Sequence, residues 1–154
     1  MQKGWPILIF LGALLLITGC SSGRSVTADD VIAKLEKLSI EAENPRKVTE
    51  DGDMSLKPET AELVRFELPS LKGSSATEGS ENSGFVLKDI PSGHIFIFEN
   101  TDDLATMENI YEELGITLEM FRSLTYAKDN ILLQVPATMP EEEFNKYKEF
   151  IDSL

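Results

Sequence analysis

Few residues of this chain could do chemistry on their own. The sequence holds one cysteine, Cys20, and one histidine, His94. A lone cysteine excludes an internal disulfide, and a lone histidine argues against a zinc site, which takes several Cys or His ligands. Because His94 precedes the apolar residues Ile95 and Phe96, we expect it to be a strand residue near the end of a sheet rather than a general base.

The carboxylates are numerous, but their spacing has a structural interpretation. Glu50-Asp51-Gly52-Asp53 could offer oxygens to calcium, yet it lacks the spacing of the twelve-residue calcium loop, and we interpret it as a solvated turn. Asp102-Asp103 and Glu141-Glu142-Glu143 are typical of helix N-termini, where the helix dipole favours acids. The sequence therefore identifies no catalytic residue, no cofactor and no metal ligand, and a hydrolase ranks third among the candidate functions.

Arg46 and Arg65 are the polar residues that stand out in so acidic a chain. An arginine can pair internally with carboxylates or present its planar fork to an anionic ligand. Internal pairing is the favoured interpretation because 27 acidic residues are available. Partner binding through Arg46 and Arg65 is the alternative.

The N-terminal segment has the three parts of an export signal. Lys3 precedes an apolar run over residues 7–17, and small or polar residues follow at Thr18 and Gly19. This run is shorter than the roughly 20 residues that a membrane-spanning helix needs, so we expect cleavage. Ile17-Thr18-Gly19-Cys20 resembles the lipobox of bacterial lipoproteins. The resemblance implies a signal peptide over residues 1–19, lipid on Cys20, and a short tether over residues 20–27.

Acyl chains on Cys20 would hold the protein at the membrane, because each buried methylene contributes about 0.8 kcal/mol. The expected location is the outer face of the cytoplasmic membrane, or the outer membrane if the source is Gram-negative. The formal net charge of −13 excludes nucleic acid as a plausible partner, since binding there depends on basic side chains. A basic protein or peptide suits this charge better.

The remaining residues, 28–154, have the length of a single domain. In its first half we expect a helix over 28–38 capped by Thr27, an edge strand over 40–48 interrupted by Pro45, and a half-buried strand over 64–68. A mobile polar loop over 72–84 and a short strand over 85–87 should follow. In its second half we expect a central strand over 94–98, a helix over 101–114 ended by Gly115, a hairpin over 121–127 and 131–135, and a last helix from Pro140. These elements predict an α+β fold with an antiparallel sheet of about four or five strands and three helices packed mainly on one face.

This domain also resembles a group of small uncharacterised lipoproteins of Gram-positive bacteria. The stretches that carry the resemblance are Glu43-Asn44-Pro45-Arg46, Arg65-Phe66 with Pro69-Ser70-Leu71, His94-Ile95-Phe96 with Glu99-Asn100, Tyr111-Glu112-Glu113-Leu114-Gly115, and Lys128-Asp129-Asn130-Ile131-Leu132. It implies no activity. We expect a lipid-anchored, non-catalytic module that binds a protein or peptide at the membrane surface, and the alternative is an accessory small-ligand or cation-binding lipoprotein.

Overall fold

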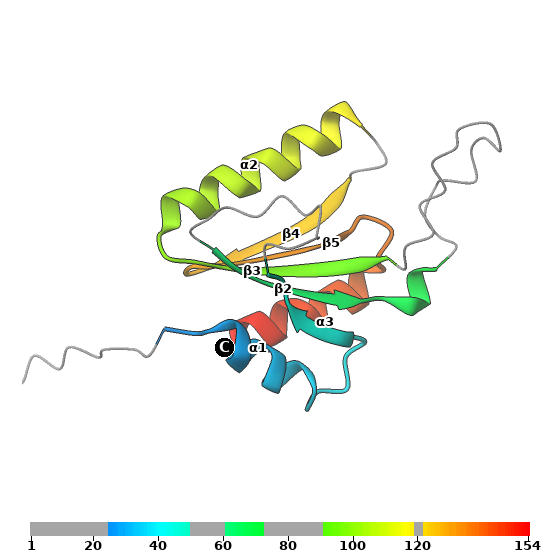
Figure 1. Ribbon diagram of the computed structural model, residues 1–154. Coiled ribbons are helices and arrows are strands. Elements are labelled where there is room, and N and C mark those ends of the chain that lie inside the picture. Colours follow the sequence, from blue (N-terminus) through cyan, green and yellow to red (C-terminus); the bar gives the residue numbers. More distant parts are fainter. Residues whose placement is uncertain (1–24, 50–60, 73–90, 119–121) are drawn as a thin grey trace, which may run out of the picture.

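The computed structural model describes residues 25–49, 61–72, 91–118 and 122–154. They form a five-stranded sheet with helices above and below it (Figure 1). In chain order the elements are α1 (Ala28–Leu35), β1 (Glu43–Lys47), β2 (Ala61–Glu67), a 3-10 turn (Pro69–Leu71), β3 (Ser92–Phe98), α2 (Thr101–Thr117), β4 (Ser123–Lys128), β5 (Ile131–Pro136) and α3 (Glu141–Asp152).

The sheet confirms the predicted α+β class. Its strands lie in the order β1-β2-β3-β5-β4, and every neighbouring pair is antiparallel. The predicted central strand is β3, which is paired on both sides. Among the described strands, β1 and β4 are the edges of the sheet.

Side chains on the two faces of the sheet form two separate apolar clusters, because successive strand residues point to opposite faces. On one face, α1 and α3 pack against Phe66, Ile95 and Leu133. On the other face, α2 packs through Leu104 and Met107 against Leu63 and Phe96. Two of the three helices therefore share one face, and α2 covers the other (Figure 1).

The first helix, α1, begins as predicted and ends one turn early. Thr27 caps it, because its hydroxyl accepts from the Asp30 N–H at 3.3 Å and the Asp30 carboxylate accepts from the Thr27 N–H at 3.2 Å. The predicted helix over 28–38 instead ends at Leu35, and Leu38 is 41% exposed. Leu38 therefore lies beyond the end of the helix and is exposed.

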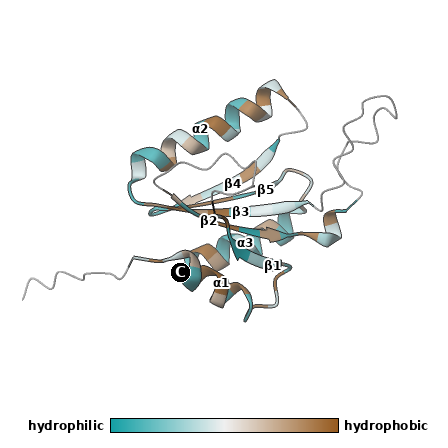
Figure 2. Ribbon diagram, in the orientation of Figure 1, coloured by the Kyte–Doolittle hydropathy of each residue, from teal (hydrophilic) through white to brown (hydrophobic). Residues whose placement is uncertain are grey.

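The second helix, α2, is longer than predicted. Asn100 caps it, accepting from the Asp103 N–H at 2.9 Å. Gly115 was expected to end the helix, and this expectation is wrong: α2 continues to Thr117. The added residues include Ile116, which is 78% exposed. This end of α2 therefore extends beyond the apolar contact between the helix and the sheet. Figure 2 shows hydrophobic and hydrophilic residues along the whole of α2.

The predicted edge strand with Pro45 is confirmed as β1. Its pairing with β2 shifts register between Glu43 and Arg46, and Asn44 has a φ of 50°. The strand predicted over 64–68 is confirmed as part of β2, in which buried Val64 and Phe66 alternate with the less buried Arg65 and Glu67. The strand begins earlier than predicted, and its first residues, Ala61 and Leu63, are buried in the cluster on the face that α2 covers.

The predicted hairpin is confirmed as β4 and β5, joined by Asp129 and Asn130 with Asp129 at a φ of 52°. The last helix, α3, starts after Pro140 as predicted. Its Tyr147 ring stacks on Phe66 with centroids 5.6 Å apart. The Tyr147 hydroxyl donates to the Glu41 carbonyl, which ties α3 to the segment before β1.

Several predictions fall outside the described residues. These are the signal peptide over residues 1–19 with Cys20, the turn at Asp51-Gly52, nearly all of the loop over 72–84 and the strand over 85–87. In the part of the chain that the structure describes, no helix is long and apolar enough to cross a bilayer.

Candidate functional site

Arg46 and Arg65 lie directly opposite each other on β1 and β2. Both belong to the face of the sheet that α2 covers, because Arg65 alternates with Val64 and Phe66 of the opposite face. Arg46 pairs with Glu67, with 3.8 Å between Nη1 and Oε1, and the two side chains are 51% and 23% exposed. Arg46 therefore has an internal carboxylate partner, and binding of another protein through these arginines stays a prediction.

His94 lies on β3 beside Arg65 of β2 and Gln134 of β5. The His94 Nδ1 lies 2.6 Å from the Gln134 Oε1, and the Gln134 Nε2 donates to the Ser123 Oγ at 2.8 Å. Because an amide oxygen can only accept, Nδ1 carries the proton in this arrangement. Gln134 thus connects His94 and Ser123 in a hydrogen-bond chain that crosses from β3 to β4. Gln134, only 8% exposed, is its central member and was not predicted.

A cleft of about 260 Å³ lies between α2 and β4. Four residues of α2 and two of β4 line it: Glu108, Asn109, Tyr111, Glu112, Ser123 and Thr125. Among the described residues, none from β3 or β5 contributes to this lining. The cleft therefore lies over the edge strand β4, on the face of the sheet that α2 covers.

The cleft is acidic. Glu108 and Glu112 are four residues apart on α2, so both carboxylates lie on one side of the helix. Like charges at this spacing destabilise a helix by a few tenths of a kcal/mol. None of the described residues that line the cleft is basic. A positive group in the cleft would therefore reduce this repulsion.

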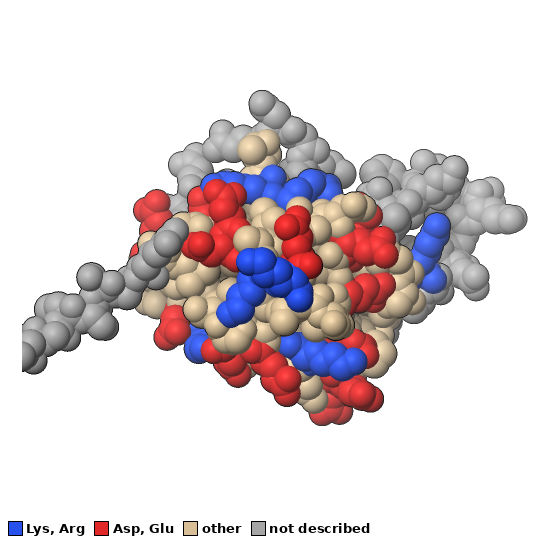
Figure 3. Space-filling model, turned by 90° about the horizontal axis from the view of Figure 1, so that it is seen from below, with Lys and Arg blue, Asp and Glu red and all other residues tan. Residues whose placement is uncertain are grey.

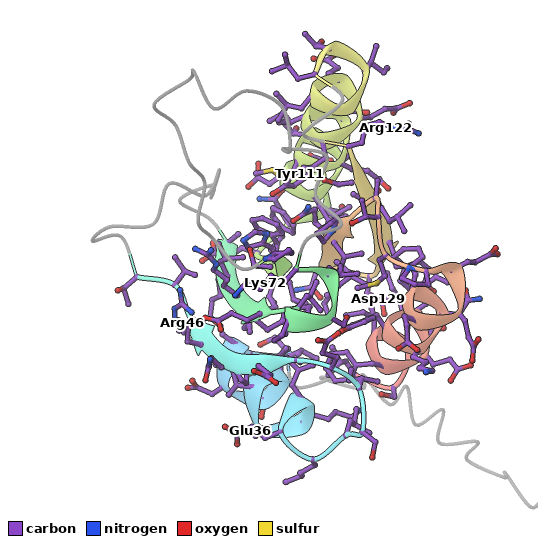
Figure 4. The ribbon with its side chains drawn as sticks, turned by 90° about the vertical axis from the view of Figure 1, so that its right-hand side faces the viewer. Glu36, Arg46, Lys72, Tyr111, Arg122 and Asp129 are labelled. Carbon is purple, nitrogen blue, oxygen red and sulfur yellow. The ribbon has the colours of Figure 1, made fainter. Side chains whose placement is uncertain are left out.

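Tyr111 forms the inner end of the cleft, where α2 meets the sheet (Figure 4). Its ring lies 6.1 Å from that of Phe96, and burial raises the pKa of its phenol to about 12. The hydroxyl is therefore neutral at physiological pH. It can offer a hydrogen bond but no charge.

The edge of β4 next to the cleft is regular. Its pairing with β5 runs without interruption from Ser123↔Pro136 to Lys128↔Ile131. The Phe98 N–H donates to the Asn130 carbonyl at 2.9 Å, which fixes the alternation of hydrogen bonds across β5. By this alternation, the backbone groups of Leu124 and Tyr126 point toward β5, and those of Thr125 point outward.

The other edge of the sheet is different. Strand β1 carries Pro45, the bulge and the left-handed Asn44, which are features that protect an edge from pairing with another strand. Figure 4 shows Arg46 of β1 and Arg122, which precedes β4, at opposite sides of the domain. Of the two described edges, β4 is the one suited to accept a further strand.

A second hollow lies between α1 and the C-terminal residue Leu154, with a volume of about 430 Å³. Lys34 lines it and donates to the Ser153 carbonyl, so this lysine connects α1 to the end of α3. On the face formed by α1 and α3, basic and acidic side chains are interspersed (Figure 3). We therefore assign no ligand to this hollow.

Within the described ranges, no three His, Cys, Asp or Glu side chains are grouped so that they could hold a metal ion. The acidic stretch Glu50-Asp51-Gly52-Asp53 lies outside those ranges. Cys20, the predicted lipid attachment residue, lies outside them as well. The solvated turn at the acidic stretch and the lipid attachment at Cys20 therefore stay predictions.

Sequence reasoning missed the cleft, although one signal was present. Ser123 and Thr125 alternate with Leu124 and Tyr126, which predicts a strand with one polar face. Nothing in that pattern indicates that α2 would lie over this polar face. Comparison of the chain with protein-family models, curated proteins and solved structures finds no match.

Proposed function

We propose that this protein is a non-catalytic module that binds an extended segment of a partner protein by adding it to the edge of β4. The observation that carries the proposal is the contrast between the two described edges: β1 is interrupted by Pro45 and a bulge, and β4 is regular. An unprotected edge offers backbone N–H and C=O groups to another chain. Main-chain hydrogen bonds then supply affinity, and side chains on alternate positions supply specificity.

Charge supports a basic partner. The chain carries 27 acidic and 14 basic residues, so a positively charged segment is attracted before contact. Such attraction raises the association rate more than the final affinity, and salt screens it over about 10 Å. We expect association to slow as ionic strength rises, with little change in dissociation.

The proposed location is the outer surface of the membrane, where acyl chains on Cys20 would hold the domain. Anionic lipid headgroups repel an acidic domain, so the lipid anchor rather than surface charge would provide attachment. The segment that would join Cys20 to the first described residue, Ser25, is short. The partner would therefore be another protein at or near the same membrane.

The test uses the full-length protein isolated in detergent and a short peptide that alternates lysine and valine. Two further peptides of the same sequence carry N-methyl groups, one on every lysine and one on every valine. Each methylated peptide has lost the N–H groups of one edge only. We expect binding by calorimetry to be lost for one methylated peptide and kept for the other. Equal behaviour of the two would contradict strand addition.

A further inference from the structure

We infer that the cleft between α2 and β4 selects a Lys or Arg side chain at every second position of the added segment, with apolar residues between. This inference rests on the proposed function and names the partner by its chemistry: an extended segment with one basic face and one apolar face. The cleft, its charge and the register of the β4 edge carry the argument.

The first step is the direction of the side chains. Ser123 and Thr125 line the cleft, and Leu124 and Tyr126 pack against the apolar cluster on the opposite face. A residue that pairs with Thr125 on the outer edge would have its side chain on the same face as Thr125. Alternate side chains of the added segment would therefore lie on the face that carries the cleft, next to its β4 wall.

The second step is the charge of the groups they would meet. Glu108 and Glu112 form one wall of the cleft, and none of its described lining residues is basic. A Lys or Arg side chain on the cleft face would pair with these carboxylates and relieve their mutual repulsion. An acidic side chain there would add a third negative charge.

The third step concerns the opposite face of the added segment. Leu124 and Tyr126 are partly buried on that face, where they extend the cluster under α1 and α3. Apolar residues of an added strand would lie beside them and remove further apolar surface from water. This face therefore favours apolar residues between the basic ones.

The geometry also fixes which backbone amides of the segment face β4. The added segment is taken to run antiparallel to β4, as every described strand pair of this sheet does. The backbone groups of Thr125 point outward, so in this arrangement the residue opposite Thr125 exchanges hydrogen bonds with it. If that residue is the basic one, its own N–H points at β4. Methylation of the lysine amides should then abolish binding, and methylation of the valine amides should be tolerated.

The experiment combines these peptides with two variants of equal net charge. Glu108→Gln/Glu112→Gln removes the charges of the cleft, and Glu113→Gln/Glu149→Gln removes two exposed carboxylates elsewhere. We expect the first variant to bind the lysine-valine peptide roughly three- to tenfold more weakly than the second. A peptide that alternates threonine and valine should not distinguish the variants. Carbodiimide crosslinks from the peptide lysines should map to Glu108 or Glu112.

The outcomes separate the two proposals. Loss of binding on methylation of valine rather than lysine would overturn the inference of an antiparallel segment with its basic face in the cleft, and would leave strand addition intact. Equal weakening of binding by the two double variants, with crosslinks outside α2, would also overturn the basic-face inference and leave strand addition intact. If neither methylated peptide differs from its parent, strand addition itself is wrong, and the inference falls with it.

Discussion

The ring of Phe66 lies over Gly93, its cross-strand partner in the pairing of β2 with β3. A Cβ built on Gly93 would lie 2.6 Å from the Phe66 Cε2 and closer still to Cζ. The same ring stacks on Tyr147 of α3. The absence of a side chain at Gly93 therefore leaves the space that the Phe66 ring occupies under α3.

Gly93→Ala should destabilise the domain. The added methyl group must displace the Phe66 ring, which has no free space because it is fully buried, and overpacking of this kind costs about 1–3 kcal/mol. Chemical denaturation measures the loss. Gly115→Ala is the control: its Cβ would lie 3.5 Å from the Arg122 Cα, an ordinary contact, and it should stabilise α2 by about 0.5–1 kcal/mol. Equal effects of the two substitutions would contradict this explanation.

Alkaline pH should destabilise the domain through Tyr111. Its pKa in the folded protein is about 12, raised by burial from the ordinary value of 10.0. The unfolded phenol ionises first, so this contribution to stability is complete below about pH 10 and is lost as the pH rises to about 12. By linkage the loss is about 2 kcal/mol. Tyr111→Phe should remove it, as measured by denaturation between pH 9 and pH 12. An unchanged pH dependence in Tyr111→Phe would contradict the assignment.

Gln134 should be important for stability although it is polar. Its amide accepts from His94 and donates to Ser123, so Gln134→Met would leave two polar groups without this partner. The expected cost is about 1–3 kcal/mol. A double-mutant cycle with Ser123→Ala gives a sharper measurement. Ser123→Ala should cost less in the Gln134→Met background than in the wild-type protein, and purely additive effects would exclude the hydrogen-bond chain.

Elements with a strong local pattern could be predicted from the sequence. The apolar spacing of Leu104 and Met107 identified α2, and the run from His94 to Phe98 identified the central strand β3. Boundaries were less accurate at helix ends. Gly115 is compatible with a C-cap, yet α2 continues past it to Thr117. The sequence alone does not show which contacts the residues after Gly115 make, so it could not place the end of the helix.

The candidate site could not be predicted because it depends on tertiary placement. An apolar stripe on α2 shows that the helix packs on a sheet, but β2, β3 and β5 carry apolar residues on both faces. The apolar pattern therefore could not show which of the two faces of the sheet α2 covers. Glu108 and Glu112 look like an ordinary solvated helix face until Ser123 and Thr125 are placed opposite them.

The final prediction concerns the lipid anchor. Cys20→Ala should abolish incorporation of a clickable fatty acid and leave the protein as an unprocessed precursor or release it from the membrane. The physical reason is that acyl chains would supply nearly all of the membrane affinity, since each buried methylene contributes about 0.8 kcal/mol and the acidic domain gains nothing from anionic headgroups. Ser21→Ala is the matched control, because it changes a neighbouring small residue and leaves the thiol in place. Undiminished labelling of Cys20→Ala would contradict the lipoprotein assignment. Labelling lost equally in both variants would attribute the effect to disturbed export rather than to the missing sulfur.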